Sequence, residues 1–129
     1  MIIGIGIDIV NVSRVEKKVG KNFETPFAKK AYAESEMAYA KARGKGAYRS
    51  LAGFFGAKEA FFKATQIWPG WKNIWVEHRE NGQPYFAFSE EAIAKLMHAQ
   101  LDLSFHTFHL TITHEKECAV ALVVVEEMD

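Results

Sequence analysis

The chain has 129 residues, 49% of them hydrophobic and 25% charged, a composition that predicts one ordinary globular domain over residues 1–129. Its 16 basic and 16 acidic residues give a formal net charge of zero, so a general nucleic-acid-binding protein is not favoured. Cys118 is the only cysteine, no apolar run reaches membrane-spanning length and no signal peptide precedes the first strand. These features fit the cytosol or an organelle lumen with reduced thiols, and we expect a cytoplasmic protein without disulfides or a membrane anchor.

Residues 1–10 predict a β-strand, because isoleucines alternate with small or polar residues. One face of this strand is apolar and carries Ile3, Ile5, Ile7 and Ile9. The other face carries Gly4, Gly6 and Asp8, and the two glycines leave room for a large neighbouring element. Taken alone, Asp8 would more often be a turn or helix-capping residue than a ligand.

The hydrophobic period becomes helical after Asn11, and either Asn11 or Ser13 can cap the new helix. An apolar stripe of this helix consists of Val12, Val15 and Val19. A basic stripe, with the spacing i, i+3, i+4 and i+7, consists of Arg14, Lys17, Lys18 and Lys21. Basic stripes are usually solvated faces, but this one also suits the docking of an acidic partner protein.

A long helix that begins near residue 47 and ends before Trp68 organises the chain. Two shorter helices precede it, one from Thr25-Pro26 and one over residues 34–42, followed by a basic turn at 43–46. One face of the long helix carries Phe55, Lys58, Glu59, Phe62 and Lys63. This face predicts either an exposed Glu59–Lys63 ion pair or a metal-and-phosphate site, in which the carboxylate binds a hard cation and the lysines bind anionic oxygens.

The rest of the chain predicts two pairs of strands with a helix between them. Strands over residues 73–78 and 85–88 form a hairpin around the Asn81-Gly82 turn, and Ser89 caps a helix that runs to about His98. Two long strands follow, over residues 106–114 and 117–125. In the first of these, Thr111 and Thr113 face one way and His114 the other; taken alone, His114 would more often be a packed strand histidine. The order of elements argues for an α+β fold with a mainly antiparallel sheet packed against the long central helix.

Four segments, in chain order, resemble the motifs of one enzyme family. Residues Ile7-Asp8-Ile9-Val10 through Arg14 are similar to Gly-x-Asp-x-x-x-x-x-Arg, and residues 55–64 resemble Trp/Phe-x-x-Lys-Glu-Ala/Ser-x-x-Lys. Residues 81–84 resemble a Gly-x-Pro turn, and residues 110–121 resemble a closing Ser-x-Thr-His-x-x-x-x-Ala-x-Ala hairpin. Together these motifs span nearly the whole chain and resemble the holo-[acyl-carrier-protein] synthases, the short type of 4′-phosphopantetheinyl transferase.

The resemblance implies the fold of that family and its reaction, in which the 4′-phosphopantetheine arm of coenzyme A moves to a serine of apo acyl carrier protein and adenosine 3′,5′-bisphosphate leaves. It implies that Asp8 and Glu59 hold a divalent cation, Mg²⁺ or Mn²⁺, at the diphosphate. Either Glu59 or a water takes the serine proton, and Lys63 stabilises the leaving phosphate. The residues implied in coenzyme A binding are Lys58, Lys63, Gly82, Pro84, Thr111, Thr113 and His114.

The resemblance also implies that the basic stripe docks the acidic carrier protein, and that the protein is a homotrimer with active sites between neighbours. Phe54 is a departure, because many members have Arg there; Arg49 or Lys45 replaces that cation, or substrate affinity is lower. From the residues alone, two other functions are open. A non-catalytic module that binds an acidic protein would need neither Asp8 nor Glu59, and a coenzyme A thioester hydrolase would have no use for two lysines on one face of the long helix.

Overall fold

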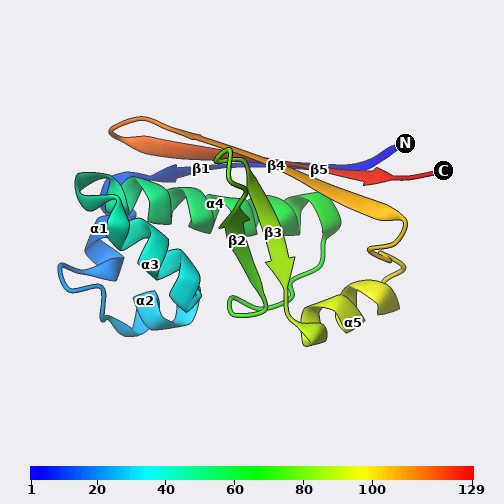
Figure 1. The fold of residues 1–129 in the computed structure, drawn as a ribbon, viewed down its shortest axis with the longest axis horizontal. Coiled ribbons are helices and arrows are strands. Elements are labelled where there is room, and N and C mark those ends of the chain that lie inside the picture. The colour runs from blue at the N-terminus through cyan, green and yellow to red at the C-terminus, as the bar shows by residue number, and fades with distance from the viewer.

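The computed structural model describes residues 1–129, and its central feature is a three-stranded antiparallel sheet with a long helix along one face (Figure 1). The strands are β1 (Ile2–Asn11), β2 (Ile74–His78), β3 (Pro84–Phe88), β4 (His106–His114) and β5 (Cys118–Glu127). The helices are α1 (Val12–Val19), α2 (Pro26–Ala31), α3 (Glu34–Ala42), α4 (Ala47–Thr65) and α5 (Glu90–His98), with one turn of 3-10 helix, η1, at Gly44–Gly46. The predicted α+β fold is confirmed.

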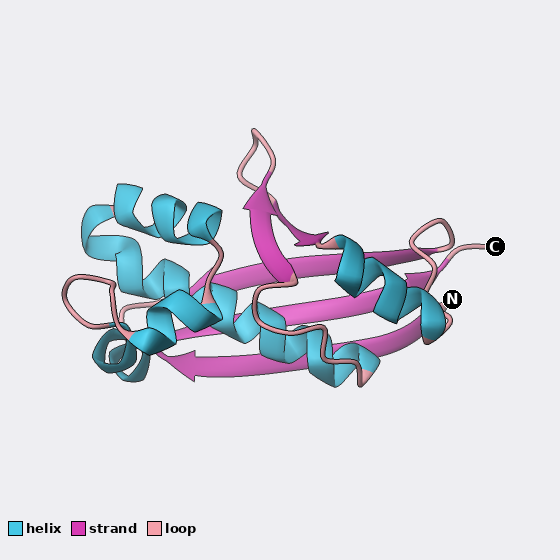
Figure 2. Cartoon of the chain, turned by 90° about the horizontal axis from the view of Figure 1, so that it is seen from below, coloured by secondary structure: helices cyan, strands magenta, loops and turns pink.

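The sheet has the strand order β1-β5-β4, and β2 and β3 pair separately as a hairpin. The register places Asp8 beside Ala121 and Ala121 beside Ile112, so that the two edge strands align across the sheet. In Figure 1, α1, α2 and α3 gather below the sheet at one end of α4, the hairpin crosses near its middle, and α5 lies toward its other end; Figure 2 shows the same arrangement from below. None of these helices is long and apolar enough to cross a membrane.

Helix α4 lies close against β1 because two glycines of the strand leave space for the helix backbone. A Cβ atom at Gly4 would lie 2.1 Å from the carbonyl oxygen of Ala64, and one at Gly6 would lie 2.1 Å from that of Ala60. No side chain fits at such distances. The predicted large neighbour of the glycine face is therefore α4, and Asp8, on the same face of β1, is held against its flank.

The outer face of the sheet is apolar and uncovered in the single chain. Its β1 residues are Ile3, Ile5, Ile7 and Ile9, which are 44%, 63%, 58% and 69% exposed. The register places Val124 beside Ile5 and Leu122 beside Ile7, so the apolar surface continues onto β5. The predicted alternation of β1 is confirmed, and the core lies on its glycine side.

Helix α1 is shorter than the basic stripe predicted. Its valines are buried as expected, but the helix ends at Val19, and Gly20 has a φ of 79°, a conformation that favours glycine. Lys21 therefore lies beyond the helix and does not share a helical face with Arg14. Asn11 accepts a hydrogen bond from the Arg14 amide and is the residue that caps the helix.

Candidate active site

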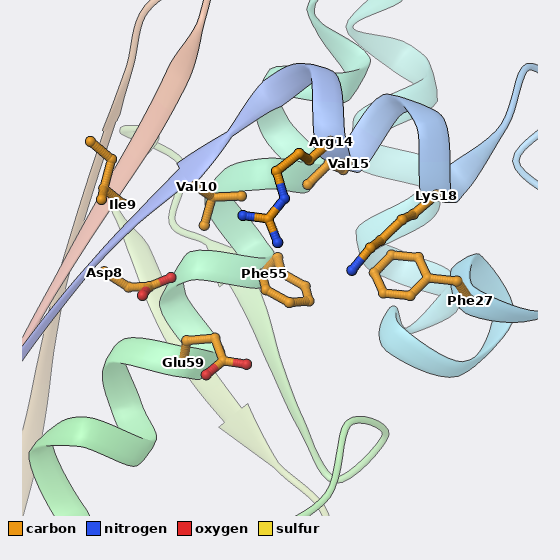
Figure 3. A pocket seen from close by; sticks show the side chains of 9 residues that line it. All are labelled: Asp8, Ile9, Val10, Arg14, Val15, Lys18, Phe27, Phe55 and Glu59. Carbon is orange, nitrogen blue, oxygen red and sulfur yellow. The ribbon is translucent and has the colours of Figure 1, made fainter.

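Asp8 and Glu59 open into one cavity of about 200 Å³, bounded by β1, α1, α2 and α4 (Figure 3). Asp8 projects from the inner face of β1, and Glu59 projects from α4 into the cavity beside this strand. The cavity is lined by Asp8, Ile9, Val10, Arg14, Val15, Lys18, Phe27, Phe55 and Glu59. The structure thus brings together the two carboxylates that the sequence singled out.

Lys63 is the ion-pair partner of Asp8. Its Nζ lies 2.9 Å from Asp8 Oδ1 and donates another hydrogen bond of 2.9 Å to the carbonyl oxygen of Ile7. The predicted pairing of Lys63 with Glu59 is replaced by this contact. Because the Lys63 side chain is 50% exposed, its ammonium can turn to an anionic ligand without disturbing the core.

Glu59 has no ion-pair partner of its own. Burial raises the pKa of its carboxyl group, the nearby charge of Asp8 raises this pKa further, and Lys63 lowers it. Two carboxylates that repel each other in one cavity suit a bound cation. The chain holds no group of three or more His, Cys, Asp or Glu side chains that could bind a metal. The donor set therefore fits a hard divalent cation that takes its remaining ligands from substrate oxygens and water.

The basic residues of α1 divide between this cavity and solvent. Arg14 and Lys18 point into the cavity from above Phe55 (Figure 3), and Lys18 Nζ lies 5.4 Å from the ring centroid of Phe27. Lys17 is exposed on the helix surface. Two cations of the predicted basic stripe thus lie directly beside the acidic pair.

Lys58 does not reach this cavity, although the motif would place it on a phosphate. Successive residues of an α-helix point about 100° apart, and Lys58 is turned away from Glu59 into the core, with 0% of its side chain exposed. Its ammonium donates to Glu36 Oε1 at 2.8 Å, to the carbonyl of Ala31 at 2.8 Å and to that of Trp71 at 3.2 Å. All three N–H groups are used inside the protein, so none is available to coenzyme A.

A basic hollow of about 430 Å³ lies on the opposite flank of α4. It is lined by Tyr39, Arg43, Lys45, Gly46, Arg49, Ser50 and His114. It continues into a hollow of about 170 Å³ that shares Tyr39, Ser50 and His114 and adds Phe54, His78, Gly82, Pro84 and Ile112. Gly82, Pro84 and His114, which were predicted from separate motifs to bind one ligand, are therefore neighbours.

Thr111 and Thr113 line neither hollow. Alternation along β4 turns Ile112 and His114 toward α4 and the two threonines to the outer face of the sheet. There the register sets Thr111 beside Leu122. Within one chain, the structure does not bring these threonines to His114.

Sequence reasoning missed Tyr39, Arg43 and His78 as parts of the basic hollow. The rings of Tyr39 and His78 stack with centroids 4.0 Å apart, and the guanidinium carbon of Arg43 lies 4.5 Å from the Tyr39 centroid. Burial lowers the pKa of His78 and the charge of Arg43 lowers it further, so its ring is neutral near pH 7. The basic turn at 43–46 was the available signal for Arg43, whereas nothing in the sequence marked the two rings.

Helix α4 separates the acidic cavity from the basic hollow within one chain. Two glycines of α4 allow it to lie close against the sheet. A Cβ atom at Gly53 would lie 2.8 Å from Ile112 Cγ2, and one at Gly56 would lie 3.3 Å from Val10 Cγ2. The acidic cavity lies on the β1 side of the helix and the basic hollow on the β4 side, with no lining residue in common.

Comparison with known proteins agrees with this geometry. Residues 4–113 match the family model of the 4′-phosphopantetheinyl transferase superfamily. A holo-[acyl-carrier-protein] synthase of Deinococcus deserti is 38% identical over 136 residues, which cover 98% of this chain and 99% of the relative. The crystal structure of the Neisseria meningitidis synthase has 31% identity and a TM-score of 0.81, covering 98% of this chain and 100% of that one.

A third similar protein was solved with a ligand. The Bacillus anthracis holo-(acyl-carrier-protein) synthase, in complex with CoA (3′,5′-ADP), is 33% identical with a TM-score of 0.72, covering 100% of this chain and 99% of that one. The family model spans most of the chain and the relatives match its whole length. The protein described here therefore belongs to the holo-[acyl-carrier-protein] synthases of the 4′-phosphopantetheinyl transferase superfamily.

Proposed function

We propose that this protein transfers the 4′-phosphopantetheine arm of coenzyme A to a serine of apo acyl carrier protein and releases adenosine 3′,5′-bisphosphate. The observation that carries the proposal is the cavity shared by Asp8 and Glu59, with the Lys63 ammonium 2.9 Å from Asp8 Oδ1. Phosphoryl transfer needs charge neutralised on the diphosphate and on the leaving group, and this set of groups supplies both. The coenzyme A complex of the Bacillus anthracis relative supports the choice of substrate.

Asp8 and Glu59 each provide one carboxylate to a divalent cation, Mg²⁺ or Mn²⁺. When bound, the cation would offset negative charge on the diphosphate of coenzyme A. A cation also removes the repulsion from Asp8 that contributes to the raised pKa of Glu59. Ionisation of Glu59 and binding of the cation therefore favour each other.

The transfer forms one bond and breaks another at the phosphorus that carries the pantetheine arm. The serine oxygen bonds to this phosphorus, and the oxygen that links it to the adenosine bisphosphate leaves. The serine proton goes to Glu59, the carboxylate without an ion-pair partner, or to a neighbouring water. Lys63 exchanges its hydrogen bond to Asp8 for one to the departing phosphate.

The basic hollow receives the nucleotide end of coenzyme A. Its cations suit the phosphate groups, the Tyr39–His78 ring stack suits the purine, and Gly82 and Pro84 line the hollow beside His78. Phe54, where many family members have Arg, is only 2% exposed and cannot bind an anion. Arg43, Lys45 and Arg49 supply the positive charge in its place.

We further propose a homotrimer with each active site between two copies. The acidic cavity and the basic hollow lie on opposite flanks of α4, so one coenzyme A molecule reaches both only if a neighbouring chain contributes one of them. The outer face of the sheet is an apolar surface suited to burial between copies. Thr111 and Thr113, which lie on that face, would approach the ligand of a neighbouring chain.

Helix α1 docks the acidic carrier protein. Arg14 and Lys18 place positive charge beside the catalytic cavity, where the carrier serine has to arrive, and Lys17 and Lys21 extend that charge outward. We place the reaction in the cytoplasm, where Cys118 stays reduced.

The test is incubation with coenzyme A, Mg²⁺ and apo acyl carrier protein, followed by mass spectrometry of the carrier. The wild type should add the mass of one phosphopantetheine arm, and Asp8→Ala and Glu59→Ala should each abolish this addition. Glu91→Ala, at an exposed glutamate of α5, is the matched control and should stay active. An unmodified carrier would refute the proposal: hydrolysis of acyl-coenzyme A would then favour a thioesterase, and binding without chemistry a docking module.

A further inference from the structure

A buried ion pair lies in the core behind the acidic cavity. Lys58 and Glu36 are both completely buried, with 2.8 Å between Nζ and Oε1. Glu36 also accepts hydrogen bonds from two backbone amides, that of Ala33 to Oε1 and that of Val76 to Oε2, each at 2.9 Å. Together with the bonds from Lys58 to the carbonyls of Ala31 and Trp71, every polar group of the pair is satisfied.

Stability alone is a weak reason for such a pair. Taking two charges out of water is costly, and apolar residues of similar volume often stabilise a fold at least as well. The pair also fixes how the elements that it joins are oriented, because hydrogen bonds have a preferred geometry. They connect α2, the start of α3, α4, β2 and the loop that follows α4.

Two of these connected segments lie at Glu59: α4 carries this residue, and the loop after α4 lies beside it. Glu59 directly follows Lys58 in α4, so fixing Lys58 fixes the turn of helix that carries the carboxylate. Trp71, held through its carbonyl by Lys58, stacks on Phe55 with ring centroids 5.0 Å apart. A hollow of about 280 Å³ beside this stack is lined by Glu59, Phe62, Trp68 and Trp71.

We propose that Lys58 and Glu36 are positioning residues for the Glu59 carboxylate. Their hydrogen bonds hold the Glu59 turn of α4 and the Trp71 wall in one arrangement, in which Glu59 lines the cavity that it shares with Asp8. The role rests on the proposed transferase function, where Glu59 is a cation ligand. Lys58 therefore supports the structure of the site, whereas Lys63 and the cations of the basic hollow bind the ligand.

A pair of variants separates positioning from stability. Lys58→Met leaves Glu36 as an unpaired buried charge and should lower Tm by roughly 10 °C or more. The double variant Lys58→Met/Glu36→Gln removes that charge and should regain part of the loss, because one of the two backbone amides that bond to Glu36 then meets an N–H group instead of an oxygen. Leu96→Ala, in the buried face of α5, opens a cavity away from the site and is the control for lost stability alone.

Two measurements report on the site itself, and both are made well below the lowest Tm so that every variant is folded. One is Mn²⁺ binding to the substrate-free protein by calorimetry, and the other is kcat and KM for coenzyme A and carrier. Positioning predicts that the double variant binds Mn²⁺ about tenfold or more weakly and loses kcat by a similar factor, despite its partly regained Tm. Leu96→Ala should keep both values. Wild-type Mn²⁺ affinity and kcat in the double variant would overturn the proposal.

Fluorescence of Trp71 gives a readout that does not depend on catalysis. In a Trp68→Phe/Trp75→Phe background, Trp71 is the only tryptophan, and positioning predicts that acrylamide quenches it more strongly once the pair is replaced. Unchanged quenching would contradict the proposal. If the wild type neither binds Mn²⁺ nor modifies a carrier, the proposed function fails, and quenching alone then decides whether the pair fixes the Trp71 wall.

Discussion

Asp8 and Glu59 share a cavity but differ in how their charge is compensated. Asp8 has the ammonium of Lys63 at 2.9 Å, whereas Glu59 has no ion-pair partner and a raised pKa. In the metal-free protein, the charge of Glu59 is therefore the one left for a cation to neutralise. This difference makes Glu59 the residue whose ionisation should report on the site.

Glu59→Gln should stabilise the metal-free protein near neutral pH. Folding raises the pKa of Glu59, so the protonated carboxyl group favours the folded state. This contribution to the free energy of unfolding is fully present below the unfolded pKa of about 4 and is lost as pH rises through the folded pKa, whereas the uncharged side chain of Glu59→Gln keeps it at every pH. Thermal denaturation in EDTA should show a small rise in Tm at about pH 7 and none below about pH 4. A lower Tm for the variant at neutral pH would contradict this prediction.

Addition of Mg²⁺ should reverse the order of the two proteins. A ligand that binds only the folded state raises Tm by mass action, so the wild type should gain stability with Mg²⁺ concentration. Glu59→Gln, which lacks one of the two carboxylates, should gain much less.

Without added metal, Asp8→Asn should lower the pKa of Glu59 in an NMR titration, because it removes one of the charges that raise this pKa.

Among the secondary-structure elements, α1 packs against the core with one face and, under the proposed function, binds the carrier with another. Its valines are buried against the core, and its cations face the cavity or solvent, so the charges can change without removing the apolar anchor. Arg14→Glu/Lys18→Glu should raise KM for the carrier by about tenfold or more, and added salt should weaken the wild type in the same direction.

The matched control for this change is Lys29→Glu/Lys30→Glu, which reverses two exposed lysines of α2 outside the cavity. This control should leave KM for the carrier nearly unchanged, and both double variants should keep their affinity for coenzyme A. An equal loss for coenzyme A and carrier in Arg14→Glu/Lys18→Glu would place these cations in the phosphate site. Steady-state kinetics with each substrate varied separately distinguishes the outcomes.

The contact between β1 and α4 sets the position of both carboxylates. Gly6→Ala would place its Cβ 2.1 Å from the carbonyl oxygen of Ala60, and the strand and helix would have to separate. We expect a loss of at least about 2 kcal/mol in the free energy of unfolding. Gly46→Ala, whose Cβ would meet nothing nearer than 3.6 Å, should be close to wild type. Urea denaturation measures both, and equal stability would show that the contact is not as close as the structure has it.

For the whole molecule, the placement of the two cavities matters most. They lie on opposite flanks of α4, and the uncovered face of the sheet carries the apolar residues of β1 and β5. Under the proposed function, a complete site then combines Glu59 of one chain with the basic hollow of another. A test of this arrangement needs two defective chains rather than one.

Mixing inactive variants should restore activity. Glu59→Gln lacks the acidic half of the site, and Arg43→Ala/Arg49→Ala lacks much of the basic half, so each protein alone should be nearly inactive. In mixed oligomers, some interfaces join an intact Glu59 to an intact basic hollow, and carrier modification should return. Co-expression with two affinity tags isolates the mixed species. A mixture as inactive as its components would show that each site lies within one chain.

The amino-acid sequence by itself determined most elements and the acidic pair. Hydrophobic period, caps and turn residues act over a few neighbours in the chain, so α3, α4 and the strands were found within a few residues of their predicted ends. Asp8 and Glu59 were found because each stands in a motif, and the glycines beside Asp8 already indicated that a large element covers its face.

Tertiary structure decided which side chains of each face reach the site. The helical spacing grouped Lys58 with Glu59, but the packing of α3 and β2 buried Lys58 against Glu36, since burial depends on elements distant in sequence. The basic hollow likewise joins residues of α3, α4, β2 and β4, which no local pattern connects. Its separation from Asp8 by α4 is a property of three-dimensional packing, because only the close fit of the helix on the sheet places the two sites on opposite flanks.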